Sequence, residues 1–393
     1  MKQNVLLILT LTLLVGCQFS NRKTSEAPEI DGFTTIDLSN DYPSTRISLQ
    51  SIADVEYVPL ETNDAVLLAG SCKLSYISDK YVVVWQNLPG DIFVFNRNGK
   101  IHTHFNRRGQ GDKEYICITS VVFDEKNEEI FVICSVARRI LVYSIAGEYK
   151  RSLSLSGDLN RLTVYNFDEE TMLFYDESGL GYSDDYNEWP YFFVSKKDGS
   201  VVSVLNYRLP VRYPDRYIIR GTTADGQNTT QPLYVTIPYN RRFGEDIIIS
   251  DISSDTIYRL TQNREMIPLM VRKPSVHKSS DPVTILISTL YTDKFIVLYE
   301  ITLDWQNINQ LHPKQFIYEY ETGQISEIWF SNADIPMFYA SQPDIDSPRN
   351  MNAQLLQIVY LKDQADYLQG DLKQLVASLD DEDNPVLMVV KFK

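Results

Sequence analysis

The sequence repeats one pattern: two runs of apolar, β-branched and aromatic residues, followed by a turn that carries a glycine. The first clear copy has apolar runs at Tyr81–Trp85 and Ile92–Phe95, then an Asn98-Gly99 turn before Lys100–Phe105. Runs that are apolar at every position predict strands buried on both faces. Asn98-Gly99 predicts a type I′ turn, because that turn needs positive φ at both central residues. This copy therefore predicts three antiparallel strands of one sheet.

The glycine turns recur at an interval that restricts the fold. They stand at Gly99, Gly147, Gly199 and Gly323, with spacings of 48, 52 and 124 residues, and the last interval holds two repeats. A sheet unit that recurs every ~50–60 residues is typical of a propeller blade, and not of a sandwich or a lipocalin barrel. The sequence thus predicts an all-β fold, a β-propeller of four-stranded antiparallel blades.

Both ends of the chain contribute to the predicted ring. Strands of the same kind recur in later copies that begin at Val121, Thr171, Asp246 and Phe295. Near the C-terminus, the spacing of leucine and valine predicts a helix at Asp371–Leu379, which ends before Asn384-Pro385. A further strand is predicted near each end, at Val55–Thr62 and Pro385–Phe392. This arrangement indicates a ring closed by both termini, which removes exposed sheet edges.

The first 17 residues differ from the rest of the chain. Lys2 precedes Val5–Val15, an apolar or neutral run of 11 residues that is too short to span a bilayer. Leu14-Val15-Gly16-Cys17 resembles the lipobox of bacterial lipoproteins, in which the signal peptide is cut before a cysteine that receives lipid. We therefore expect a signal peptide at 1–17 with lipidation at Cys17, a flexible tether at 18–33 and the propeller at 34–393. An ordinary secretory signal is the less favoured alternative.

The residue after the cysteine bears on location. In lipoproteins of bacteria with two membranes, Asp at this position usually retains the protein at the inner membrane, whereas Gln18 stands here. The resemblance therefore implies an outer-membrane lipoprotein of the cell envelope. The periplasmic face and the cell surface both stay open.

Charge and metal-binding residues limit the partners. A net charge of −15 argues against nucleic acid, because phosphate binding needs a basic surface. No Cys-x-x-Cys pair occurs and the chain has four histidines, so we expect no metal and no cofactor. Besides Cys17, the chain has Cys72, Cys117 and Cys134, an odd number that argues against a disulfide scaffold. Cys134 is interpreted as a small buried side chain, and a Cys117–Cys134 bridge is the less favoured alternative.

Three segments resemble the six-bladed β-propeller lipoproteins of diderm bacteria, which are relatives of the NHL-type propellers. They are Val55–Thr62, the glycine-rich corner Asn106–Tyr115 and the C-terminal Asp383–Phe392. The corner departs from the family pattern at Asn106, where glycine is usual, and at Asp112-Lys113, where Pro-Gly is usual. The resemblance covers residues 54–393 and implies six blades. It implies little about function, because these proteins are mostly uncharacterised.

The corner is the first candidate site. Arg107 and Arg108 could present guanidinium groups to a carboxylate or to sugar hydroxyls, with Tyr115 beside them. The alternative, which we favour, is structural: the glycines let the chain turn between blades, and an arginine pairs with Glu114.

Two aromatic-rich stretches supply the other candidates. Tyr182–Phe193 contains Trp189, and Tyr207–Tyr217 contains Tyr213 and Arg216. Aromatic rings beside Asp, Asn and Arg suit the binding of a glycan or a peptide, because rings stack and polar groups fix hydroxyls. Packing of the same rings between blades is an equal alternative.

We therefore expect a lipid-anchored binding or scaffold module for a glycan, a peptide or an envelope protein. The alternative is an NHL-like enzyme, a lyase or a lactone hydrolase with a metal in the central channel. Carboxylates and amides that converge on the channel would favour the enzyme. Aromatic and arginine side chains without such a cluster would favour binding.

Overall fold

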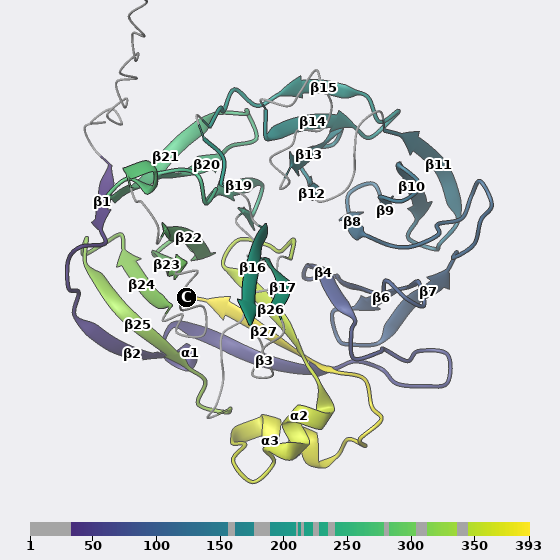
Figure 1. Cartoon of the computed structure of the whole chain (residues 1–393). Coiled ribbons are helices and arrows are strands. Elements are labelled where there is room, and N and C mark those ends of the chain that lie inside the picture. Colours follow the sequence, from purple (N-terminus) through teal and green to yellow (C-terminus); the bar gives the residue numbers. More distant parts are fainter. Residues whose placement is uncertain are drawn as a thin grey trace, which may run out of the picture. The chain divides into compact units, whose positions relative to one another are not determined.

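The computed structural model describes residues 33–155, 162–176, 189–209, 211–213, 216–222, 228–234, 240–278, 283–303, 313–335 and 345–393, with backbone alone at 216–222, 228–234 and 303. Thr34–Lys393 forms one compact unit that contains every described strand and helix. This unit is a six-bladed β-propeller, as expected (Figure 1).

Each of five blades contains four consecutive strands that pair antiparallel with their neighbours. Blade 1 has β4 (Lys73–Ile77), β5 (Tyr81–Trp85), β6 (Asp91–Asn96) and β7 (Ile101–Asn106). Blade 2 has β8 (Ser120–Asp124), β9 (Glu129–Cys134), β10 (Arg139–Ser144) and β11 (Tyr149–Ser154). Blade 3 has β12 (Leu162–Asn166), β13 (Thr171–Asp176), β14 (Tyr191–Ser195) and β15 (Val201–Val204). Blade 4 has β18 (Asn240–Phe243), β19 (Asp246–Ile249), β20 (Thr256–Leu260) and β21 (Met266–Lys273). Blade 5 has β22 (Val283–Tyr291), β23 (Phe295–Leu303), β24 (Lys314–Glu319) and β25 (Ile325–Ser331).

The remaining elements add to this frame. β1 (Thr34–Asp37) and β2 (Ser44–Ser48) pair in parallel with β21 and β25, so the start of the compact unit extends blades 4 and 5 at their outer edges. β16 (Arg216–Thr222) and β17 (Asn228–Tyr234) form a separate hairpin. The described helical segments are α1 (Leu49–Ile52), η1 (Val276–Lys278), α2 (Ile358–Asp363) and α3 (Gly370–Ala377). α3 confirms the helix expected at Asp371–Leu379.

Blade 6 closes the ring with both ends of the chain. Its C-terminal strand β27 (Val386–Phe392) lies between β26 (Met351–Leu356) and β3 (Ala53–Pro59), with Val386 opposite Pro59. On the inner side, Asp346 forms a parallel bridge with Tyr76 of β4 and so joins blade 6 to blade 1. The predicted closure by N- and C-terminal strands is confirmed.

The turn at Asn98-Gly99 differs in type from the one expected. Gly99 has a φ of +83°, but Asn98 is not among the residues with positive φ. Asn96 and Lys100 close a three-residue loop, and the strand register shifts by one residue beside it. This is a type I turn followed by a glycine bulge, so the prediction of a type I′ turn is wrong. The Asn98 side chain accepts the Lys100 N–H at 3.1 Å, which stabilises the loop without positive φ at Asn98.

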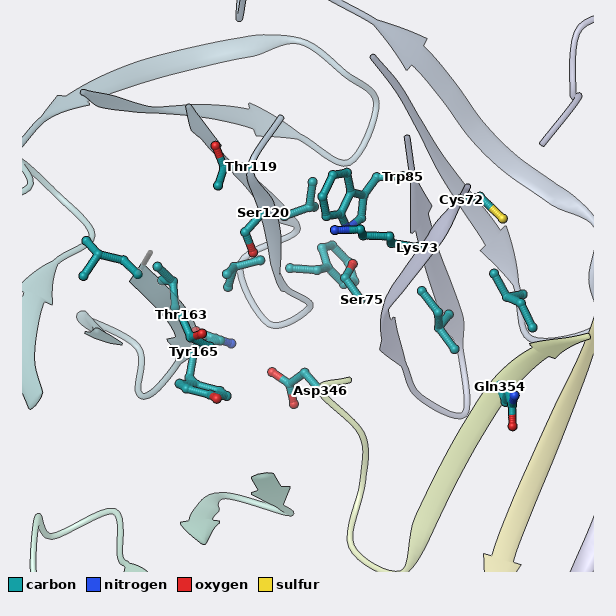
Figure 2. Close-up of a pocket in the computed structure, with 18 residues that line it drawn as sticks. Cys72, Lys73, Ser75, Trp85, Thr119, Ser120, Thr163, Tyr165, Asp346 and Gln354 are labelled. Atoms are coloured by element: carbon teal, nitrogen blue, oxygen red, sulfur yellow. The ribbon is translucent and has the colours of Figure 1, made fainter. Parts of the chain in front are cut away.

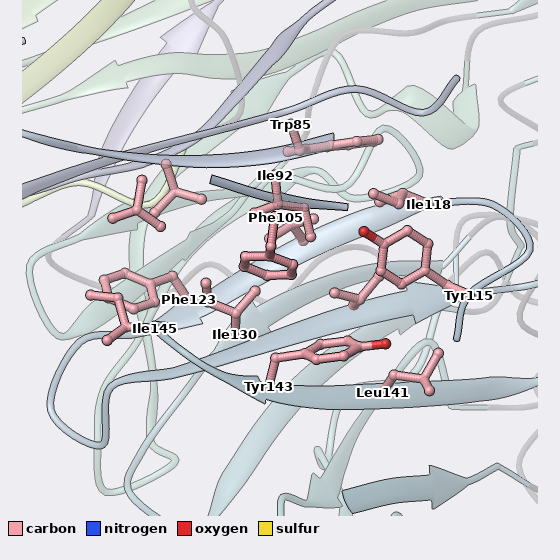
Figure 3. Packing of buried hydrophobic residues seen from close by; sticks show 14 of the residues in the cluster. Trp85, Ile92, Phe105, Tyr115, Ile118, Phe123, Ile130, Leu141, Tyr143 and Ile145 are labelled. Atoms are coloured by element: carbon pink, nitrogen blue, oxygen red, sulfur yellow. The ribbon is translucent and has the colours of Figure 1, made fainter. Parts of the chain in front are cut away.

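The core lies between adjacent blades. The second strands β5, β9 and β13 are buried at every position, because each blade packs against a neighbour on both faces. Figure 3 shows the cluster between blades 1 and 2, where the ring centre of Phe105 in blade 1 lies 5.5 Å from that of Tyr143 in blade 2. No helix in the described ranges is long and apolar enough to cross a membrane.

Candidate functional site

A pocket of about 650 Å³ opens where the first strands of blades 1, 2 and 3 meet the Asp346 segment. These strands lie nearest the middle of the ring (Figure 1). Figure 2 shows the side chains that surround the pocket. The polar ones are Lys73, Ser75, Thr119, Ser120, Thr163, Asn166, Asp346 and Gln354.

The inner strands bring polar and apolar side chains to the pocket. In β4, Lys73 and Ser75 both line it, and the strand register shifts at Ser75, so strict alternation does not hold there. In β12, Thr163 and Tyr165 share a face, whereas Val164 packs against blade 2 and also borders the pocket. The first strands therefore contribute both hydroxyl groups and aliphatic side chains to the pocket wall.

The lining combines polar and apolar side chains and carries little net charge. Lys73 and Asp346 are the charged residues among the described lining, and the Lys73 Nζ lies 5.0 Å from the centre of the Trp85 ring. The backbone of Asp346 bonds to Ser75 O at 3.0 Å and Ile77 N at 2.9 Å, which fixes the carboxylate at the pocket. Burial raises the pKa of the Asp346 carboxyl, an effect opposed by Arg242, whose Nε lies 3.6 Å from Oδ1.

A cluster of carboxylates and amides in the central channel would favour the enzyme alternative. The described lining contains one carboxylate, that of Asp346, and the two amides of Asn166 and Gln354. No group of three or more His, Cys, Asp or Glu side chains suited to hold a metal occurs among the residues that the structure describes. Four serine and threonine hydroxyls make up half of the eight polar side chains, and Lys73 is the remaining one.

The corner residues form one hydrogen-bonded unit. Tyr115 is fully buried, and its hydroxyl donates to Gly90 O at 2.7 Å and accepts the Arg107 N–H at 2.8 Å. Burial raises the pKa of Tyr115 to about 12. The side chains of Arg107 and Arg108 are exposed, and their Nε atoms donate to Gly147 O and Ile116 O.

Glu114 is held by Arg139 of blade 2, and not by Arg107 or Arg108. The Glu114 carboxylate accepts the Gly111 N–H at 2.9 Å. Its main-chain carbonyl accepts Arg139 Nη2 of blade 2 at 2.6 Å, and the same atom donates to Gly111 O at 3.1 Å. These bonds tie the corner to the next blade. The binding role proposed for Arg107, Arg108 and Tyr115 stays a prediction.

The aromatic candidates lie at blades 3 and 4. Trp189 precedes β14 and is covered by Arg208, whose guanidinium carbon is 4.2 Å from the ring centre. The Tyr213 hydroxyl donates to Val276 O at 3.2 Å, and its ring stacks on His277. Arg216 begins β16, where only the backbone is described. The described contacts do not join these three residues to the corner, and Cys17 lies outside the described residues.

The roles of the corner can be separated by mutation. Tyr115→Phe is expected to lower the free energy of unfolding by about 1–3 kcal/mol, because it leaves Gly90 O and the Arg107 N–H without their buried partner. The matched control is Tyr149→Phe, whose hydroxyl forms no hydrogen bond within the described ranges, and it should change stability by less than about 0.5 kcal/mol. Urea unfolding measures both. Equal stability of the two variants would contradict a structural corner.

Comparison with known proteins identifies relatives by sequence and by fold. Residues 33–391 match a family described as a domain of unknown function, DUF4934. A structure of a protein described as exported, from Bacteroides fragilis, superposes with a TM-score of 0.62 at 15% identity and covers 92% of this chain and 99% of its own. This likeness shows the fold alone. No curated protein matches.

Two further structures are more distant. A member of the DUF4221 family from Bacteroides vulgatus has a TM-score of 0.47 at 10% identity, covering 87% of this chain and 97% of its own. A virginiamycin B lyase from Staphylococcus aureus has a TM-score of 0.39 at 13% identity, covering 86% and 99%. Similarity this low carries no argument about activity.

Proposed function

This chain belongs to the DUF4934 family, and we propose that it is a binding module that holds a glycan in the central pocket. The observation that carries the proposal is the lining, in which hydroxyl and amide side chains from blades 1, 2, 3 and 6 converge on one cavity. A volume of about 650 Å³ lies within the range of roughly 300–1,000 Å³ that is usual for small-molecule sites.

The chemistry of the lining favours a neutral ligand rich in hydroxyl groups. Serine and threonine hydroxyls both donate and accept, as sugar hydroxyls do. One cation and one carboxylate in the described lining give no net charge to attract an anion or a cation. Trp85 and Tyr165 also border the pocket, but they are 4% and 8% exposed, so the hydroxyl and amide groups would supply most of the contacts to a ligand.

The proposed setting is the cell envelope. Cys17 carries lipid in this proposal and tethers the propeller to the outer membrane through the polar segment 18–33. The likeness to a protein described as exported supports an envelope protein. The partners are then the membrane, through the anchor, and an envelope glycan, with a peptide or an envelope protein as the alternative occupants of the pocket.

A thermal-shift screen tests the binding proposal. The protein is residues 18–393, which keep the whole compact unit, and the probes are a panel of oligosaccharides and divalent metals with and without chelator. A glycan that binds the folded state should raise the Tm, and titration calorimetry then gives its Kd. A shift with metals alone, abolished by chelator, would contradict the proposal and support the enzyme.

Matched variants locate the site. Ser120→Leu fills the pocket and should weaken glycan binding at least about tenfold, because the larger side chain takes the place of ligand. Ser152→Leu, on the exposed face of outer strand β11, should leave the Kd unchanged. If Ser120→Leu binds normally while Trp189→Ala or Tyr213→Ala does not, the ligand lies at the aromatic stretches and the central pocket is wrong.

A further inference from the structure

The structure brings together two cysteines that are separated by 17 residues. The Sγ atoms of Cys117 and Cys134 lie 4.0 Å apart, and both side chains are free thiols. Cys134 ends β9 and is fully buried, whereas Cys117 is half-buried in the connection between β7 and β8. One thiol of the pair is thus accessible to a reagent and the other is protected.

The closeness of the two thiols follows from the sheet. Thr119, two residues after Cys117, donates its N–H to Ile133 O at 2.8 Å, and its hydroxyl lies 2.9 Å from the Ser135 hydroxyl. These bonds hold the start of β8 beside the end of β9, through the neighbours of Cys134 on both sides. A disulfide has an S–S distance of about 2.05 Å, so the two sulfur atoms would have to approach each other by about 2 Å.

We propose that Cys117 and Cys134 are a modification site that closes to a disulfide in an oxidising compartment. The accessible Cys117 thiolate attacks a small disulfide and releases one thiolate, leaving a mixed disulfide at Cys117. The Cys134 thiolate then attacks the Cys117 Sγ and releases the second half of the donor. Two protons leave the protein thiols and two electrons reduce the donor to two thiols, so the exchange is balanced.

The bridge would fix a segment that matters to the pocket. Cys117 follows the glycine-rich corner and precedes Thr119 and Ser120, which line the pocket. Joining Cys117 to β9 would restrain this entry to blade 2. The third described cysteine serves as an internal control: Cys72 also lines the pocket, but its Sγ has the Gln357 amide at 3.9 Å and not a second thiol.

The test uses the protein from residue 18, reduced and then incubated with oxidised glutathione. Thiols that remain are alkylated, and the peptides are identified by mass spectrometry. We expect a linked Cys117–Cys134 peptide together with alkylated Cys72. Closing a loop of 17 residues should raise the Tm by about 4 °C. This value is the free energy expected from loop closure divided by the entropy of unfolding of a chain of this length. Dithiothreitol should reverse the rise.

Variants separate the outcomes. Cys72→Ser should keep both the linked peptide and the rise in Tm, and Cys117→Ser should lose both. Alkylation of all three cysteines after oxidation would overturn the proposal, and so would glutathione that stays attached to Cys117. A linked peptide that contains Cys72 would also overturn it. The linked peptide is sought in the unsubstituted protein, so the result does not depend on the folding of a variant.

Discussion

Gly99→Ala is expected to destabilise the propeller by about 3 kcal/mol, more than the same change at an equivalent turn. The residue has a φ of +83°, where an alanine costs about 1 kcal/mol. A Cβ at this position would also lie 2.2 Å from Pro59 O, the last residue of β3, and a clash with backbone typically adds about 1–3 kcal/mol. Gly99 O accepts the Glu61 N–H at 2.9 Å, so the clash falls where blade 1 meets the closing strand of blade 6.

Gly323→Ala is the matched control. It also follows a hairpin turn and has a φ of +66°, but a Cβ there would meet nothing within 4 Å. It should cost about 1 kcal/mol, the conformational penalty alone. Denaturant midpoints at equal m values measure the difference between the two variants. Equal losses would mean that the Gly99 turn does not pack on the end of β3.

The sequence identifies the middle strands of the blades because their signal is local. Tyr81–Trp85 and Glu129–Cys134 are buried on both faces, so nearly every position is apolar and the strand is apparent without knowledge of its partner. The glycine turns mark their hairpins in the same way. Closure by β3 and β27 was also predictable, since a strand without a hairpin partner near each terminus has few other places to pair.

The inner strands are harder to predict from sequence. β12 and β18 have the sequences LTVYN and NRRF, in which polar residues alternate with apolar ones or outnumber them. A strand that faces the middle of a propeller is buried on its sides and polar toward the pocket, so its pattern resembles that of a loop. The pocket is lined by inner strands such as β12, which is why Thr163 was not among the predicted site residues, while Asp346 reaches the pocket from an isolated bridge outside the named strands.

The corner shows a second limit of sequence analysis. Its glycines and Tyr115 form a recognisable motif, but the motif does not reveal whether the tyrosine faces solvent or the core. The ring of Tyr115 is buried in the apolar cluster between blades 1 and 2, and its hydroxyl is satisfied by Gly90 O, which lies 25 residues earlier in the chain. Arg139, which holds Glu114, comes from the next blade. Non-local contacts of this kind decide the role of a motif.

Lys196→Met is expected to cost about 3–5 kcal/mol, the loss typical of removing one partner from a buried ion pair. The Lys196 Nζ of blade 3 lies 2.6 Å from Asp124 Oδ2 of blade 2, and the two side chains are 5% and 4% exposed. Without the lysine, the donors left to the Asp124 carboxylate among the residues that the structure describes are the Asn127 backbone and amide. The pair joins two blades, so the charge that remains is buried at their interface.

Two further variants distinguish this effect from the loss of a long side chain. Lys80→Met removes one partner of the exposed Lys80–Glu128 pair, whose atoms are 3.6 Å apart, and should cost less than about 1 kcal/mol. Adding Asp124→Asn to Lys196→Met removes the unpaired charge, so the double variant should be more stable than Lys196→Met alone. Urea unfolding of Lys196→Met, Lys80→Met and the double variant measures these free energies. A double variant less stable than Lys196→Met would show that packing of the lysine stem, and not the buried charge, sets the loss.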